Sequence, residues 1–348
     1  PVISPGKARL AIFVAMVLIT PIYSSFSEPS ELRNSEPMMA QDEVELKLYT
    51  LYLASQNTSA GGDGYITTEV PDSGGEDSAS ALDNEIEFRS SDMLSSLEVY
   101  GRSQHGSSGY YVPLDLFLRA TGPNGATVDW TITLKAGGSQ VGTASWSTDA
   151  CTQGITNSCS FDHEEFDVDL GQDASFTVSK NEMLEISISA EMSGCESSGG
   201  PFGSSCDAEV AWNEIDGEPD RFSQIEVEAN AISNSLVLLQ REGAELAEGP
   251  ELDWYPNDIL SDRAMQFTFD VKSSFGRYDI ESTRLLMRDP NGVYRIDHII
   301  NEDDEDIEDT SQGIFGEYMW TYPGGLPAGE YSVELEITDI QGNDFLIE

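Results

Sequence analysis

Basic side chains are scarce in this chain. Its 348 residues include 17 Lys and Arg, of which only five are Lys, against 63 Asp and Glu, so the formal net charge is −46. Binding to nucleic acid or to an anionic membrane surface requires a basic footprint, so this balance argues against both partners. A membrane contact remains open only through the N-terminal segment or through a C-terminal tail beyond residue 348. Acid-rich, Lys-poor surfaces suit salty surroundings, which predicts a halophilic or marine source.

Catalytic signatures are missing as well. The chain has no Gly-x-Ser-x-Gly elbow, no His-Glu-x-x-His, no P-loop and no Gly-x-Gly-x-x-Gly between a strand and a helix. Its three histidines, His105, His163 and His298, are scattered, and Ser103 beside His105 makes no triad by itself. We therefore predict that the chain is not an enzyme, and we assign it no cofactor other than the candidate ion Ca²⁺ discussed below.

Cysteine is limited to four residues, which allow three disulfide connectivities. We favour the sequential pairs Cys151 with Cys159 and Cys195 with Cys206, because each pair brackets one loop between strand-like segments. A zinc site is the competing interpretation, and it fits poorly because no Cys-x-x-Cys pair is present. Disulfides would require an oxidising compartment.

Residues 1–27 predict export. Lys7 and Arg9 precede an apolar run from Leu10 to Ile22, and small polar residues follow, which is the order of a secretory signal peptide. A retained membrane anchor is the alternative, although Pro21 interrupts the run before it reaches the length of a spanning helix. A pilin-like filament helix is a third possibility, which prolines also disfavour. Residues 28–43 are polar and predict a linker.

From residue 44 to residue 230 the apolar residues alternate with polar ones, as in half-buried strands. Between Val128 and Leu134, for example, every second residue is apolar, which predicts one face in a core and one in water. About ten such segments, separated by Gly, Pro and Asn turns, predict an all-β fold, and a jelly-roll-like β-sandwich is the favoured form.

Residues 231–348 repeat the pattern with six or seven strands, which is the size of an immunoglobulin-like β-sandwich. The segment Leu326-Pro-Ala-Gly-Glu-Tyr-Ser-Val-Glu-Leu-Glu-Ile-Thr-Asp-Ile-Gln-Gly-Asn343 resembles the penultimate strand and turn of Ig-like and PKD-like modules of secreted and cell-surface proteins. The resemblance covers this segment alone and implies a module type, in which the tyrosine fills the edge of the core. The chain stops just after the next strand begins and does not start with Met, so we expect both ends to be trimmed.

Calcium is the metal that so many carboxylates predict, because Ca²⁺ takes six to eight oxygen ligands. Asp167, Asp169 and Asp173 follow the alternate spacing of a calcium loop but lack its glycine and its final glutamate. A second candidate is the acidic run 301–309, with the possible ligands Asp303, Asp304 and Asp306. In both segments a solvated strand or loop is the alternative. Asn57, in Asn57-Thr-Ser59, is a candidate glycosylation site.

Together these patterns predict an exported, non-enzymatic extracellular or cell-surface protein with a structural or adhesive role. Ca²⁺ is the candidate stabilising ion, and cell-surface proteins or glycans are the expected partners. One alternative is a carbohydrate-binding protein or the accessory region of a polysaccharide-degrading enzyme. It would use loop-edge aromatics such as Tyr110, Tyr111, Trp146, Trp254 and Tyr255, while Trp130, Trp212 and Trp320 are expected in the core. The other alternative is the filament subunit.

Overall fold

The computed structural model describes residues 46–55, 63–71, 77–82, 84–103, 109–152, 158–195, 206–213, 215, 221–242, 245–249, 263–300 and 307–347. These residues form strands and one short 3₁₀ helix, with no α-helix among them, so the all-β prediction is confirmed. Residues 44–348 make one compact unit. The predicted N-terminal signal or anchor helix lies outside the described residues, and no described helix meets the length and apolarity that crossing a membrane requires.

The elements, in chain order, are β1 (Lys47–Ser55), β2 (Gly64–Thr67), β3 (Asp77–Ser80), β4 (Glu85–Arg89), β5 (Leu97–Tyr100), β6 (Arg102–Ser103), β7 (Tyr110–Thr121), β8 (Thr127–Ala136), β9 (Ser139–Asp149), β10 (Asp162–Gly171), β11 (Ser175–Val178), β12 (Leu184–Ser193), β13 (Asp207–Trp212), β14 (Gln224–Asn230), β15 (Ile232–Glu242), β16 (Glu245–Gly249), β17 (Ala264–Ser273), the 3₁₀ helix η3 (Arg277–Asp279), β18 (Ile280–Arg288), β19 (Tyr294–Ile299), β20 (Ile307–Asp309), β21 (Gly313–Thr321), β22 (Ser332–Asp339) and β23 (Asp344–Ile347).

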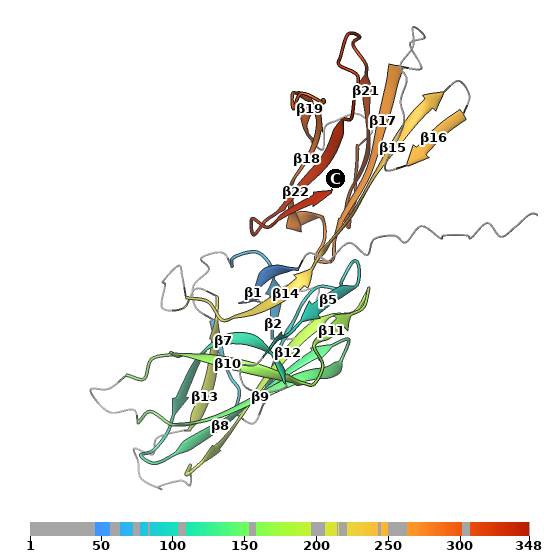
Figure 1. Ribbon diagram of the computed structural model, residues 1–348. Helices are drawn as coiled ribbons and strands as arrows, with labels where there is room; N and C mark the ends of the chain where they lie inside the picture. The colour runs from blue at the N-terminus through green and yellow to red at the C-terminus, as the bar shows by residue number, and fades with distance from the viewer. Residues whose placement is uncertain are drawn as a thin grey trace, which may run out of the picture. The chain divides into compact units, whose positions relative to one another are not determined.

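The strands before Ala231 belong to a single hydrogen-bonded sheet (Figure 1). Its path runs β14-β1-β2-β4-β12-β8-β9-β10-β7, and a further pairing of β14 with β7 closes this path on itself. Three joints of the ring are thin: one residue pair joins β9 to β10, two pairs join β2 to β4, and two pairs join β14 to β7. The body predicted as a jelly-roll-like sandwich is therefore a closed ring of strands with three short seams.

The strands after Ala231 form two further sheets, with the orders β16-β15-β17-β21-β20 and β19-β18-β22-β23. Figure 1 shows the β18 and β22 pair facing β17 and β21. The turn at Asp289-Pro-Asn-Gly292 joins β18 to β19. There Gly292 has a positive φ of 75°, and the Asp289 carboxylate accepts the backbone N–H groups of Asn291 and Val293.

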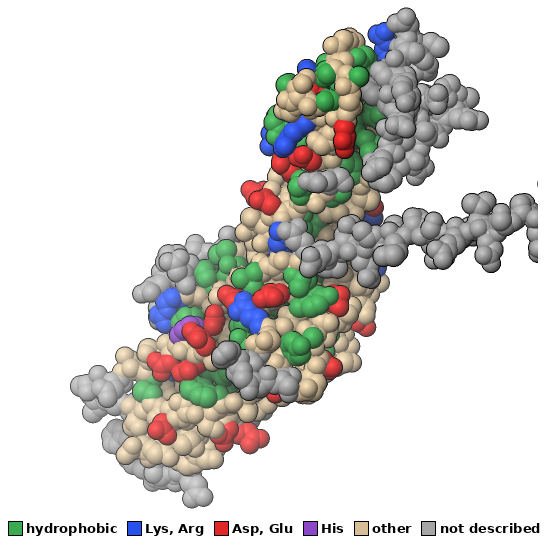
Figure 2. Space-filling view, viewed as in Figure 1, with side chains coloured by type: hydrophobic (Ala, Val, Ile, Leu, Met, Phe, Trp, Pro, Cys, Tyr) green, Lys and Arg blue, Asp and Glu red, His purple; other side chains and the backbone are tan. Residues whose placement is uncertain are grey.

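The alternation of apolar and polar residues explains why these segments form strands. In β8, Val128, Trp130, Ile132 and Leu134 are buried, while Asp129 and Thr131 are exposed, as the sequence predicts. Trp130 and Trp212 lie in the core, and Trp320 and Trp146 are half-buried against it. Most of the described acidic side chains lie at the surface, and Figure 2 shows several spread over the face in view, whereas Asp279, Asp289, Glu334 and Asp339 are buried.

Both predicted disulfides are present. Cys151 pairs with Cys159 and Cys195 pairs with Cys206, across sequence separations of 8 and 11 residues. They use all four cysteines of the chain, so no thiol is left for a zinc site. Disulfides persist in oxidising surroundings, which indicates that the chain folds in an oxidising compartment.

Candidate metal centre

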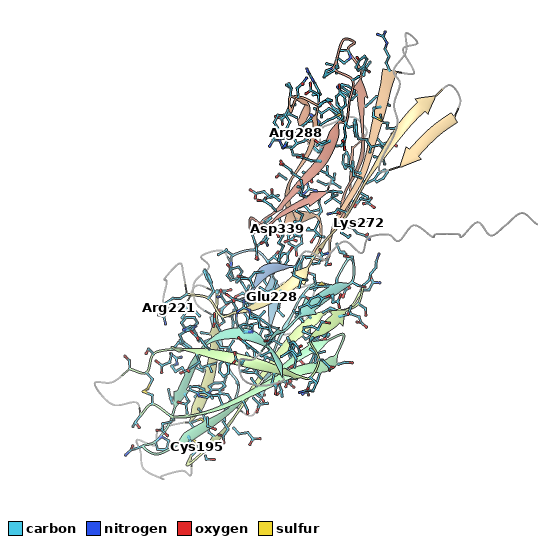
Figure 3. All side chains as sticks on the ribbon, in the orientation of Figure 1. Cys195, Arg221, Glu228, Lys272, Arg288 and Asp339 are labelled. Carbon is cyan, nitrogen blue, oxygen red and sulfur yellow. A yellow bond between two sulfur atoms is a disulfide. The ribbon has the colours of Figure 1, made fainter. Side chains whose placement is uncertain are left out.

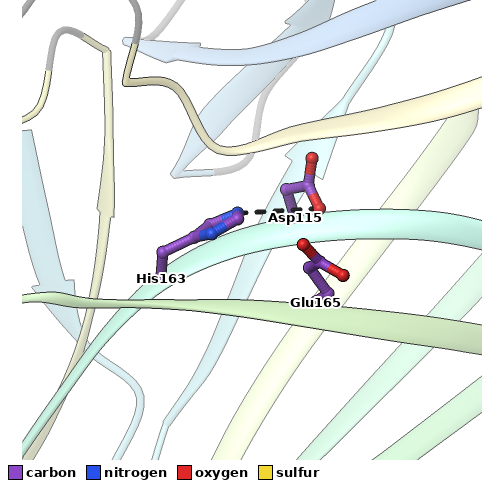
Figure 4. A group of neighbouring side chains, drawn as sticks. All are labelled: Asp115, His163 and Glu165. Atoms are coloured by element: carbon purple, nitrogen blue, oxygen red, sulfur yellow. Dashed lines mark ion pairs between the residues drawn. The ribbon is translucent and has the colours of Figure 1, made fainter.

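Strands β7 and β10 bring three side chains together that lie far apart in the sequence. The two strands are antiparallel neighbours, and their register sets Glu165 directly opposite Asp115 and His163 opposite Phe117. His163 and Glu165 are two residues apart on β10, so they point to the same face of the sheet. Asp115, His163 and Glu165 therefore share one patch, which Figure 4 shows.

The spacing of this trio suits a small metal ion. One ligand atom from each residue lies within 4.8 Å of the other two. His163 Nε2 is 3.7 Å from Asp115 Oδ1. Ligands on a tetrahedral Zn²⁺ ion are separated by about 3.3 Å, given metal–ligand distances of roughly 2.0–2.1 Å. Small side-chain rotations would close the remaining gap.

Neighbouring side chains hold two of the three residues in position. Gln224 on β14 lies opposite Asp115 and donates from Nε2 to Asp115 Oδ2 at 3.1 Å, which leaves Oδ1 directed at His163. The His163 ring packs on the Phe117 ring, with centroids 5.0 Å apart. Arg221, labelled in Figure 3, places its guanidinium 4.7 Å from the centroid of Phe117. Support of this kind fixes ligand orientation in metal sites.

The patch is accessible from solvent. The side chains of His163 and Asp115 are 44% and 25% exposed, and Glu165 is exposed. Two carboxylates directly opposite each other on neighbouring strands repel each other, and a cation between them would remove that cost. The site thus has three ligand atoms, neighbouring side chains that orient two of the ligands, and two opposed carboxylates whose repulsion a bound cation would relieve.

Among the described residues, this trio is the one set of at least three His, Cys, Asp or Glu side chains with metal-ligand spacing. The predicted calcium ligands Asp167 and Asp169 lie on the exposed face of β10, and Asp173 is exposed in the following turn. Asp169 accepts the N–H of Gly171 within that turn. Asp303, Asp304 and Asp306 lie outside the described residues, as does Asn57. Calcium binding at either segment stays a prediction.

Of the aromatic residues proposed for sugar stacking, the three that the structure describes are half-buried. Tyr110 and Tyr111 are half-buried in β7, and Trp146 packs edge-on against Phe166. Trp254 and Tyr255 lie outside the described residues. In the described part of the chain, the large exposed apolar side chains include no tryptophan.

Sequence reasoning missed the trio because Asp115 and His163 are brought together by strand pairing. The sequence pattern that could have indicated a metal site was His163-Glu-Glu165, because it places an imidazole and a carboxylate on one face of a strand. Finding Asp115 required knowing that β10 pairs with β7 and in which register.

Comparisons with known proteins add little to this picture. No protein-family model matches the chain, and no curated protein matches it. Among solved structures, a selenomethionine-labelled α-amino acid ester hydrolase is similar at 12% sequence identity with a TM-score of 0.33. The match covers 52% of this chain and 36% of that one.

The matching structure is named as a hydrolase, so the comparisons give no support to the structural, adhesive, sugar-binding or filament roles predicted from the sequence, and we do not propose those roles further. At this TM-score and identity the likeness transfers neither a fold nor an activity to this chain.

Proposed function

We propose that this chain is an exported protein that binds a divalent transition-metal ion, with Zn²⁺ as the probe of choice, through Asp115, His163 and Glu165. The observation that carries the proposal is the convergence of one imidazole and two carboxylates from β7 and β10 on a common point. Three protein ligands leave a fourth position open to water or to a small ligand, as in many zinc sites.

The ligand set favours a transition metal over Ca²⁺. Calcium takes six to eight oxygen ligands and does not use imidazole, whereas Zn²⁺ and its neighbours bind imidazole readily. All four cysteines are in disulfides, so thiolates do not compete for the ion inside this chain. Because β7 and β10 supply the ligands, the bound metal would also fasten these two strands together.

We also propose that the site is not catalytic. Within the described residues, His163 contacts the Asp115 carboxylate and the Phe117 ring and makes no hydrogen bond to a serine or cysteine. A nucleophile within hydrogen-bonding reach of its base is what Ser- or Cys-based acyl transfer requires. We therefore do not propose His163 as the base of such a nucleophile, and the role that we propose for the site is to hold a metal ion.

An extracellular location and the two module types are also proposed. The paired cysteines and the signal-like residues 1–27 support export.

We propose a jelly-roll-like body before Ala231 and an Ig-like body after it. Tyr331 supports the second assignment, because its hydroxyl donates to the carbonyl of Pro327, four residues upstream, at 2.8 Å, as in the tyrosine corner of Ig-like sandwiches.

Titration calorimetry with Zn²⁺ tests the metal proposal. The wild-type chain is titrated in 0.15 M salt with millimolar Mg²⁺ present. Mg²⁺ occupies the scattered carboxylates but binds imidazole poorly, so it does not compete for His163. We expect one tight Zn²⁺ per chain, at least a tenfold loss of affinity in His163→Ala, and a smaller loss in Glu165→Gln.

His298→Ala is the matched control. His298 is half-buried and stacks on Tyr318, with centroids 4.8 Å apart, just as His163 stacks on Phe117, but it belongs to another sheet. The control variant should bind Zn²⁺ like the wild type. Equal affinity in the wild type and His163→Ala would rule out the proposed site.

A further inference from the structure

A buried acidic cluster lies where the turn after β22 meets β1. It consists of Tyr49, Thr68, Ser273, Asp279 and Asp339, and each of these side chains is at most 2% exposed. Asp339, labelled in Figure 3, ends β22, and Asp279 ends η3. Tyr49 lies in β1, Thr68 follows β2, and Ser273 ends β17, so five elements contribute.

Asp339 organises the turn that follows it. Its Oδ1 accepts the backbone N–H groups of Gln341 and Asn343, each at 2.9 Å, and its Oδ2 accepts Asn343 Nδ2 at 2.9 Å. Three donors therefore fix the position of this carboxylate. We call residues 339–343 the β22–β23 turn.

The β22–β23 turn reaches β1 and the end of β2. Gln341 Oε1 accepts the N–H of Thr50 at 2.9 Å, and Gln341 Nε2 donates to the carbonyls of Thr50 at 2.6 Å and Thr68 at 2.9 Å. Asn343 Nδ2 also donates to the carbonyl of Leu48 at 3.3 Å. Correct placement of the turn thus decides whether these contacts form.

Asp279 is the member of the cluster that lacks a full set of partners. Its Oδ2 accepts the Ser273 hydroxyl at 2.7 Å, but its Oδ1 is buried without a hydrogen bond. Tyr49 Oη and Thr68 Oγ1 are also buried without one. The groups that act on the Asp279 carboxyl are Asp339, Ser273 and Thr68, and none of them is a cation.

Two buried carboxylates without a counter-charge cannot both stay ionised at low cost. A metal ion is a poor solution here, because Asp339 already accepts three hydrogen bonds and few oxygens remain for the six to eight that Ca²⁺ needs. A proton on the unpartnered Oδ1 of Asp279 removes one charge and adds a donor among the acceptors Asp339, Thr68 and Tyr49.

We propose that protonated Asp279 keeps the β22–β23 turn docked on β1, and that ionisation of Asp279 loosens this contact. The other ionisable groups of η3 are Arg277, whose Nη1 donates to the carbonyl of Ile280 at 2.7 Å, and Tyr278, which Glu69 faces from the β2 side. Ionised Asp279 would repel Asp339, and the strain would fall on the turn that carries Gln341 and Asn343. The backbone N–H of Ile340 donates to the carbonyl of Asp279 at 3.0 Å, which ties the two segments directly.

The titration falls in an accessible range. Burial raises the pKa of Asp279 to about 6 from 3.8; the neighbouring Ser273 and Thr68 hydroxyls oppose the rise, and the charge of Asp339 adds to it. Because the raised pKa belongs to the docked form, the protonated and docked state dominates at low pH. Docking weakens as the pH rises through about 6.

Amide hydrogen exchange at Thr50 in the full chain tests the proposal, because this N–H donates to Gln341 Oε1. After correction for intrinsic exchange, wild-type protection should fall on the order of tenfold between pH 5 and pH 8. Asp279→Asn, which is neutral at both pH values, should abolish the fall. Asp289→Asn, at a buried aspartate paired with Arg295, should leave it unchanged.

Three results would overturn the proposal. One is constant wild-type protection over this range, a measurement that needs no variant to fold. Another is an equal fall in Asp279→Asn. The third is recovery of protection on adding millimolar Ca²⁺ at pH 8, which would show that a cation and not a proton neutralises the cluster.

Discussion

Asp279→Asn should stabilise this protein at pH 8, although the replaced side chain is completely buried. Substitutions at buried polar positions normally destabilise. Here the wild-type protein carries an ionised carboxylate in a site that favours the neutral form, and burial raises the pKa of Asp279 from 3.8 to about 6. Asparagine keeps the shape of the neutral acid and can still accept from Ser273.

The magnitude follows from the pKa difference between the folded and unfolded states. A difference of about two pKa units corresponds to about 3 kcal/mol of unfolding free energy. The folded pKa is the higher one, so this stabilisation is complete below about pH 4 and is lost as the pH rises through 6. At pH 8 we expect Asp279→Asn to be more stable than the wild type by about 1–3 kcal/mol, and near pH 4.5 the difference should nearly vanish.

Urea denaturation of both proteins at several pH values measures this effect. The quantity to follow is the difference between the two, because protonation of the other 62 acids changes both proteins alike. Asp289→Asn should change the unfolding free energy in the opposite direction. Although desolvation acts to raise the pKa of Asp289, hydrogen bonds from the backbone of Val293 and Asn291 and from Arg295 hold it below its usual range. Its replacement should destabilise at pH 8. An Asp279→Asn protein less stable than the wild type at pH 8 would refute the reasoning.

Other predictions concern the core, the disulfides and the turn. Trp130→Ala removes a 1% exposed side chain and should lower the unfolding free energy by about 3–5 kcal/mol, measurable by denaturant titration. Replacing Cys151 and Cys159 by serine opens a short loop and should cost about 2.5 kcal/mol in the same assay, whereas no change would show that the bridge adds nothing. Gln341→Ala deletes three hydrogen bonds and should lower the melting temperature and speed exchange at Thr50, and unchanged exchange would argue against a docked turn.

Much of the fold could be predicted from the sequence because strand burial leaves a period-2 signature. Val128 to Leu134 shows it clearly, and the structure buries the apolar residues as expected. The disulfide pairs followed from loop lengths, which are local quantities. Closure of the first sheet into a ring depends on which distant strands pair, for example β14 with β7, and alternation carries no information on partners.

The candidate sites were harder to predict from the sequence, because they too depend on which distant strands pair. The sequence drew attention to the acidic residues Asp167, Asp169 and Asp173, which lie on the exposed face of β10 and in the turn after it. The trio of Asp115, His163 and Glu165 depends on register between strands, and the burial of Asp279 beside Asp339 depends on packing of η3 against β22. Neither relation is local along the chain.

The most direct test of the metal proposal is a crystal structure of the Zn²⁺-loaded protein with anomalous data at the zinc edge. We expect an anomalous peak between β7 and β10, about 2.0–2.2 Å from His163 Nε2 and from carboxylate oxygens of Asp115 and Glu165. Ordered zinc elsewhere on the acidic surface with no peak at this trio would contradict the proposal.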